Sequence, residues 1–163
     1  MSIPARVSRW QSLATDVAAL FKLDPMLILA IMDRESLGGD ALSPKGPEGT
    51  GDAGHGRGLM QIDDRAHPDF IAQQHKDGTP LWQVPYDNLE FAARLLKANL
   101  DALGGDVAAA VAAYNCGLGR IRKAQAQMRP DATLRERLHA YDCFTTGRDY
   151  CSDVLARRDA FSM

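Results

Sequence analysis

The chain has 163 residues, a length that suits one domain with a buried core. Apolar residues make up 45% of the sequence and charged residues 25%, which is ordinary for a globular protein. The formal charge of -2 argues against a nucleic-acid-binding protein, and no apolar run approaches the ~18 residues that span a bilayer.

The N-terminal part is predicted to form two helices. Apolar residues recur at helical spacing over about Pro4 to Phe21. Asp24-Pro25 is a strong start for the second helix, since Asp caps free N–H groups and Pro fits the first turn. Its segment Met26 to Met32 is apolar on every side, which is typical of a central, buried helix. Glu35 should therefore lie in the last turn of a buried helix that ends near Gly38-Gly39.

A long glycine-rich interruption follows. Eight of the fourteen glycines lie between Gly38 and Gly58, which indicates a long loop or a small irregular sheet. Loops of more than ~12–15 residues in a compact domain are often functional. Leu59 to Ile62 is predicted to be a short buried strand, with Asp63 directly after it.

The C-terminal half is predicted to be helical. An amphipathic helix runs from about Leu89 to Leu103 and ends at Gly104-Gly105. Asp106 is expected to cap an Ala-rich helix, and Gly117 and Gly119 should interrupt the chain again. Further helices are expected over Val107 to Tyr114, Thr133 to Tyr141 and Asp149 to Phe161. The predicted fold class is mostly α, one domain over residues 1–163, with helices around a buried central helix and a small β region.

Cysteine and histidine give no sign of a metal site. Cys116, Cys143 and Cys151 match no zinc spacing, so the alternatives are one disulfide plus a free thiol, or three buried thiols. The four histidines are scattered along the chain. We expect no metal and no cofactor.

Glu35 is the candidate acid. Burial against apolar groups raises the pKa of a carboxyl, and the negative end of the helix dipole acts in the same direction. A carboxylic acid that stays protonated near neutral pH is what glycoside hydrolysis requires. The alternative is an ordinary solvated residue at a helix end.

Asp52 and Asp63 are candidates for the second carboxylate. An inverting glycosidase needs a base that holds a water across the sugar from the acid. Both residues could instead be ordinary turn residues. The glycines around them do not form a phosphate-binding loop, because neither nucleotide-binding pattern is present.

Three other sites are candidates for lining a cleft, since sugars stack on aromatic faces and bond to amides. These are His67, the pair Tyr114-Asn115, and Tyr150. The tyrosines could equally be core residues with one satisfied hydroxyl, and Asn115 could be a helix cap.

Four motifs in order resemble goose-type lysozymes and, more widely, the lytic transglycosylases. The resemblance covers about Ile28 to Arg157. It is carried by Asp33-Arg34-Glu35-Ser36, by Gly51-Asp52 through Gly58-Leu59-Met60-Gln61-Ile62-Asp63, by Ala113-Tyr114-Asn115, and by Thr145-Thr146-Gly147-Arg148-Asp149-Tyr150 with Asp153-Val154.

The resemblance implies a lysozyme-like fold and a muramidase, which cleaves the β-1,4 bond between N-acetylmuramic acid and N-acetylglucosamine with inversion. Glu35 would be the general acid, and Asp52 and Asp63 would position the water. The cleft would be lined by Gln61, His67, Tyr114, Asn115 and Tyr150. Because lytic transglycosylases typically lack those aspartates, their presence favours hydrolysis.

Three alternatives remain open at this stage. One is a lytic transglycosylase that forms 1,6-anhydro products, another is a non-catalytic module that binds peptidoglycan, and the last is a structural helical protein. Expected partners are peptidoglycan glycan strands, with a proteinaceous lysozyme inhibitor or immunity protein as a further candidate. We expect a monomer that binds no nucleic acid and does not span a membrane.

The resemblance also implies action outside the cytoplasm, in the periplasm or the extracellular cell wall. Met1 to Val7 lacks the apolar segment of a secretory signal. We therefore expect either that a signal has been removed or that the protein is delivered by a non-Sec route, such as phage lysis or an effector system.

Overall fold

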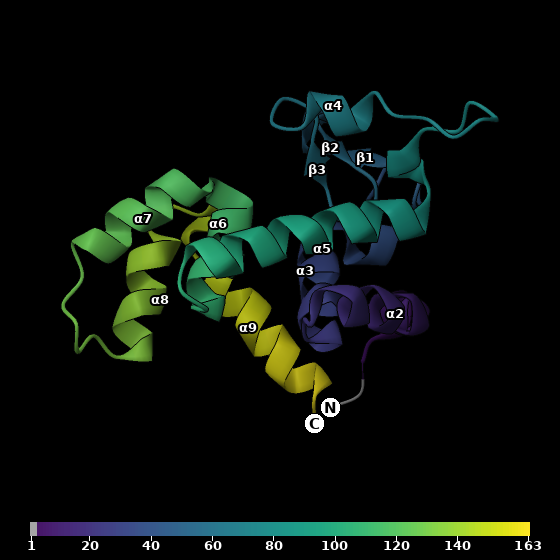
Figure 1. Ribbon diagram of the computed structural model, residues 1–163. Helices are drawn as coiled ribbons and strands as arrows, with labels where there is room; N and C mark the ends of the chain where they lie inside the picture. Colours follow the sequence, from purple (N-terminus) through teal and green to yellow (C-terminus); the bar gives the residue numbers. More distant parts are fainter. Residues whose placement is uncertain (1–2) are drawn as a thin grey trace.

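The computed structural model describes residues 3–163, which form a mostly helical chain with one small antiparallel sheet (Figure 1). This confirms the predicted fold class. The helices are α1 (Ala5–Ser8), α2 (Gln11–Phe21), α3 (Pro25–Ser36), α4 (Pro68–Ile71), α5 (Pro85–Ala102), α6 (Val107–Cys116), α7 (Leu118–Ala126), α8 (Leu134–Asp142) and α9 (Tyr150–Phe161). The strands are β1 (Thr50–Gly51), β2 (Gly56–Arg57) and β3 (Ile62–Asp63).

Helix α3 lies at the centre of the molecule, as predicted. The Asp24 carboxylate accepts a hydrogen bond from the Met26 amide and so caps the first turn. Residues 27 to 33 are all buried, and the helix packs against α2 and α9. Leu37, in the left-handed conformation, ends the helix one residue after Ser36.

The first predicted helix is wrong in one respect, because two helices, α1 and α2, occupy its range. They are separated at Arg9 and Trp10, whose side chains both donate to the carbonyl of Gly38, at 2.7 Å and 3.0 Å. The break thus ties the N-terminal segment to the end of α3, a long-range contact that helical periodicity does not report.

The glycine-rich segment forms the sheet, in the order β1-β2-β3, with Thr50 opposite Arg57 and Gly56 opposite Asp63. The predicted strand from Leu59 to Ile62 is wrong, since Leu59 to Gln61 form a turn and the strand is β3. Gly58 makes this turn possible. Its φ is +68°, and a Cβ there would lie 2.6 Å from both the Asn88 amide nitrogen and the Trp82 carbonyl oxygen.

The C-terminal helices follow the predicted order with one correction. Asp106 caps α6 by accepting from the Ala109 amide, and Thr133 with Glu136 forms a capping box on α8. Gly117 ends α6 with a φ of +91°, as expected. Gly119 does not interrupt the chain, because it adopts a helical conformation inside α7, a helix that the sequence did not predict.

Ion pairs link α9 to α3. Asp33 is 1% exposed and accepts from Arg6 on α1, at 2.5 Å, and from Arg157 on α9. The next residue, Arg34, donates to Asp149 at 2.7 Å and to Asp153 at 3.0 Å. The pairs of Asp33 hold their geometry strictly, since loss of one arginine would leave its buried carboxylate less compensated. They therefore set the position of the residue that follows, Glu35.

All three cysteine thiols are free in the structure, so the disulfide alternative is wrong. The alternative of three buried thiols is also wrong, because Cys151 is buried, Cys116 is partly exposed and Cys143 is exposed. Among the helices of the described residues, none has the length and apolar character needed to cross a membrane.

Candidate functional site

An open cleft of about 740 Å³ lies between residues of the sheet and residues of the C-terminal helices. Side chains from the sheet, α5 and α6 form its walls, and Glu35 lies at the end of α3. Every site residue predicted from the sequence except Tyr150 lines it, namely Glu35, Asp52, Gln61, Asp63, His67, Tyr114 and Asn115.

Tyr150 is buried behind Glu35 instead of facing the cleft. Its hydroxyl donates a short hydrogen bond to Glu35 Oε1. The Tyr114 hydroxyl donates to the Met60 carbonyl at 2.9 Å, so this second tyrosine joins α6 to the turn before β3. The two hydroxyls are both satisfied, and Tyr150 fixes the orientation of the Glu35 carboxyl.

The Glu35 carboxyl is harder to ionise than an ordinary glutamate. Burial raises its pKa to about 7, and the negative charge of Asp52 acts in the same direction. The hydrogen bond from Tyr150 and the charge of Arg34 oppose this rise. Arg34 is engaged by Asp149 and Asp153, which orients its guanidinium toward α9. Near neutral pH a large fraction of Glu35 therefore carries a proton.

Asp52 and Asp63 share one cation, Arg65, but in unequal ways. Asp63 accepts from Arg65 Nε at 2.9 Å, from Nη2 at 2.6 Å and from the Arg65 amide at 2.8 Å. These bonds lower the pKa of Asp63 to about 2. Asp52 has a single 3.0 Å contact with Arg65 Nη2, and its side chain is 66% exposed. Asp52 thus stays open to water and to ligand, whereas Asp63 is committed to Arg65.

Gln61 is held tightly against the sheet. It has a φ of +49°, and its Nε2 donates to the Gly58 carbonyl at 2.9 Å. A Cβ on either Gly51 or Gly56 would lie 2.2 Å from its Oε1, so both glycines are required for this close approach. The glycines of the loop therefore serve to seat Gln61 in the wall of the cleft.

His67 and Asn115 occupy the cleft walls with fixed partners. The His67 ring meets Phe91 edge-on, with centroids 5.2 Å apart, and burial lowers the pKa of His67 while the charge of Asp63 opposes this. Asn115 Oδ1 accepts from the Thr146 amide at 2.9 Å, which ties α6 to the segment before α9. Asn115 is therefore a link between segments, not a helix cap.

Several cleft residues were missed by sequence reasoning. Arg65, Leu95, Asn99, Cys116 and Thr146 line the cleft, but none has a distinctive pattern around it. Asn88, on α5, supports the wall of the cleft. Its side chain accepts a hydrogen bond from the Met60 amide and donates one to the Arg57 carbonyl, which joins α5 to the segment between β2 and β3. Within residues 3–163, no group of three or more His, Cys, Asp and Glu side chains is placed to hold a metal ion.

Comparisons with known proteins identify the family of the chain. Residues 12–134 match the family model described as "Transglycosylase SLT domain". Lysozyme g of Cyprinus carpio is 32% identical over 96% of this chain and 75% of its own length. Lysozyme G of Dromaius novaehollandiae is 30% identical over 93% of this chain and 65% of its own length.

A solved structure supports the fold alone. An inactive mutant of the lytic transglycosylase Slt from Pseudomonas aeruginosa superposes with a TM-score of 0.71 at 22% identity. The match covers 93% of this chain but 23% of that protein. Together, these findings show that the chain belongs to the lysozyme-like SLT family, which includes the goose-type lysozymes, as the sequence motifs indicated.

The raised pKa of Glu35 predicts a pH-dependent stability. Because the carboxyl ionises near pH 7 when folded but near pH 4.5 when unfolded, ionisation disfavours the folded state as the pH rises through this window. Glu35→Gln removes the ionisation. We expect the stability of the variant relative to the wild type to rise by at most about 3.5 kcal/mol between pH 4 and pH 8, at roughly 1.4 kcal/mol per pKa unit.

Urea unfolding between pH 4 and pH 8 measures this difference. The exposed residue Glu48 offers the control, since Glu48→Gln removes a carboxylate without a burial cost. A stability difference between Glu35→Gln and the wild type that stays constant across this range would contradict the raised pKa.

Proposed function

We propose that this protein is a peptidoglycan hydrolase, a muramidase that cleaves the β-1,4 bond between N-acetylmuramic acid and N-acetylglucosamine with inversion. The observation that carries the proposal is Glu35, a carboxyl with a pKa of about 7 at the end of a buried helix, in a cleft of about 740 Å³. Family membership supports peptidoglycan as the class of substrate. The action would then take place outside the cytoplasm.

In the proposed mechanism, protonated Glu35 donates its proton to the glycosidic oxygen as the bond to the anomeric carbon breaks. The hydrogen bond from Tyr150 keeps the carboxyl in one orientation before transfer. After transfer, the same bond and the charge of Arg34 stabilise the carboxylate, because both favour the ionised form. Tyr150 thus acts through Glu35, as a positioning residue.

The attacking water would be activated by Asp52. Its carboxylate is exposed to the cleft and close enough to Glu35 for its charge to be felt there. Asp63 would be a weaker base, since its pKa is about 2 and its oxygens are bonded to Arg65. We therefore assign Asp52 the water and Asp63 the placement of Arg65, with Gln61, His67, Tyr114 and Asn115 shaping the binding cleft.

A lytic transglycosylase is the second candidate, favoured by the description of the matching family model. It would use Glu35 in the same way, but the 6-hydroxyl of the muramic residue would attack in place of water. The presence of an exposed carboxylate at Asp52 supports the hydrolase, because intramolecular attack needs no group to hold a water.

Mass spectrometry of purified peptidoglycan after digestion tests the proposal. We expect the wild-type protein to release muropeptides with reducing ends. Glu35→Gln should form no product while remaining folded, because it can no longer donate a proton. Products lighter by one water would instead identify the transglycosylase, and the absence of product from the wild type would contradict both enzymatic candidates.

The two aspartates should differ in their effects on the rate. Asp52→Asn removes the proposed base and should lower kcat by about 10²–10⁴-fold, as is typical for general-base residues. Asp63→Asn should lower it by less, roughly tenfold, because it only releases Arg65. Initial rates of reducing-end formation measure both effects. A larger loss in Asp63→Asn would reverse the assignment, and wild-type rates in both variants and in the double variant would exclude both residues.

A further inference from the structure

Charge is distributed unevenly along the chain. Residues 117–139, which contain α7 and most of α8, carry six Arg and Lys side chains and two acids, a formal charge of +4. The rest of the chain carries -6. In Figure 1, α7 and α8 lie near one end of α5, whereas the sheet and α4 lie over its other end. Although the total charge is only -2, residues 117–139 therefore form a basic lobe.

Three cations on α7 are available to a ligand. Arg120, Arg122 and Lys123, here called the α7 basic surface, are all exposed. The ion pairs of this lobe involve Arg129 and Arg137 instead. In the part of the chain that the structure describes, the α7 basic surface has no acidic partner.

The α7 basic surface continues from the cleft. Gly117 and Leu118, at the start of α7, line the cleft together with Cys116. The positive charge of Arg120 acts on the Cys116 thiol, which places its guanidinium near that wall. A polymer lying in the cleft would therefore contact the start of α7.

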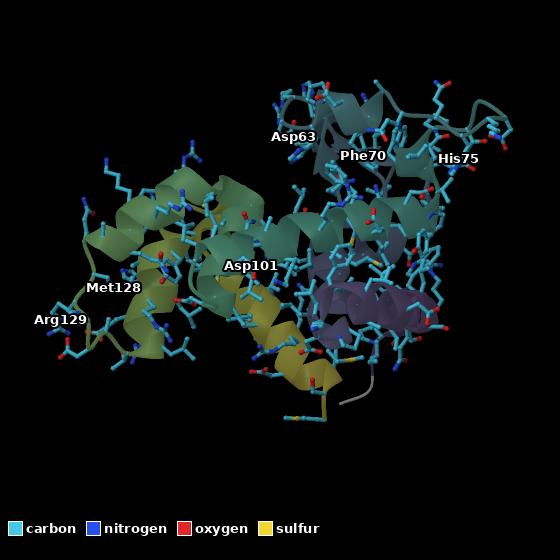
Figure 2. The ribbon with its side chains drawn as sticks, in the orientation of Figure 1. Asp63, Phe70, His75, Asp101, Met128 and Arg129 are labelled. Atoms are coloured by element: carbon cyan, nitrogen blue, oxygen red, sulfur yellow. The ribbon has the colours of Figure 1, made fainter. Side chains whose placement is uncertain are left out.

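Among the described residues, the opposite side of the cleft carries paired charges instead of free cations. Asp52, Asp63 and Asp64 lie there with Arg57 and Arg65 as their ion-pair partners. Figure 2 shows Asp63 on the sheet side, whereas Arg129 marks the far end of the basic lobe. Cations without an acidic partner within residues 3–163 therefore lie on the α7 side, where they favour an anionic substituent on a bound strand.

We propose that the α7 basic surface binds the carboxylates of the peptidoglycan stem peptides while the glycan strand lies in the cleft. This inference rests on the proposed function for its substrate. Guanidinium and ammonium groups suit this ligand, since they form charge-assisted hydrogen bonds with carboxylates. The α7 basic surface would favour strands whose stem peptides are intact and charged.

The test compares two substrates and two proteins. The substrates are soluble peptidoglycan strands and the same strands after their stem carboxylates have been converted to amides. The proteins are the wild type and a triple variant, Arg120→Gln, Arg122→Gln and Lys123→Gln. We expect the triple variant to lose about five- to tenfold in kcat/KM on charged strands, as three exposed ion pairs of modest strength would give.

Amidation of the substrate and neutralisation of α7 should remove the same interaction, so their effects on kcat/KM should not add. Amidated strands should lower kcat/KM for the wild type by the same factor, and the triple variant should not distinguish the two substrates. The control is a second triple variant, Lys22→Gln, Lys45→Gln and Lys76→Gln, which removes the same charge from exposed positions away from α7. It should retain the preference of the wild type.

A binding measurement keeps this test separate from catalysis. In the Glu35→Gln background, co-sedimentation with insoluble peptidoglycan should weaken when the α7 basic surface is neutralised, even if the wild type proves to be a transglycosylase or inactive. Equal behaviour of the two triple variants would overturn the proposal. So would loss of binding to vesicles of anionic phospholipid with unchanged binding to peptidoglycan, because α7 would then recognise a lipid surface.

Discussion

The burial of one carboxyl at the end of α3 is the constraint on which the site depends. Glu35 lies beside the cleft at the end of a helix whose preceding segment, Met26 to Met32, is apolar, so its charged form is poorly solvated and its pKa rises to about 7. The surrounding groups moderate this effect without cancelling it. Tyr150 and Arg34 favour the carboxylate, whereas Asp52 disfavours it. The residue can therefore hold a proton at neutral pH and still release it.

The position of that carboxyl is set by contacts from distant parts of the chain. Asp33 joins α1, α3 and α9 through Arg6 and Arg157, and Arg34 joins α3 to Asp149 and Asp153. Because Glu35 follows both residues directly, the same ion pairs that fix α9 also bring Tyr150 to it. The same polar network therefore holds α9 against α3 and fixes the position of the Glu35 carboxyl. On the sheet side of the cleft, Arg65 forms several hydrogen bonds with Asp63 but only one with Asp52, so the two carboxylates differ in how free they are.

The sequence predicted the parts of this design that depend on local patterns. The capped α3, with its apolar segment Met26 to Met32, and the order of the motifs identified Glu35, Asp52 and Asp63, and all three line the cleft. What could not be predicted depends on contacts between distant residues. The break at Arg9 and Trp10 satisfies the Gly38 carbonyl, the turn at Leu59 to Gln61 depends on Asn88, and Arg65 is ordinary until its two carboxylates are adjacent. Total charge likewise gave no hint of the basic lobe.

The most direct test of this account is a titration of the Glu35 carboxyl itself, followed by carbon NMR of protein labelled at glutamate side chains and assigned by comparison with Glu35→Gln. The account predicts one carboxyl with a pKa near 7, which moves upward in Tyr150→Phe because the hydrogen bond that favours the carboxylate is lost. An ordinary pKa near 4.5 for Glu35 would mean that the carboxyl is ionised at neutral pH and cannot be the proton donor, and the proposed mechanism would fail.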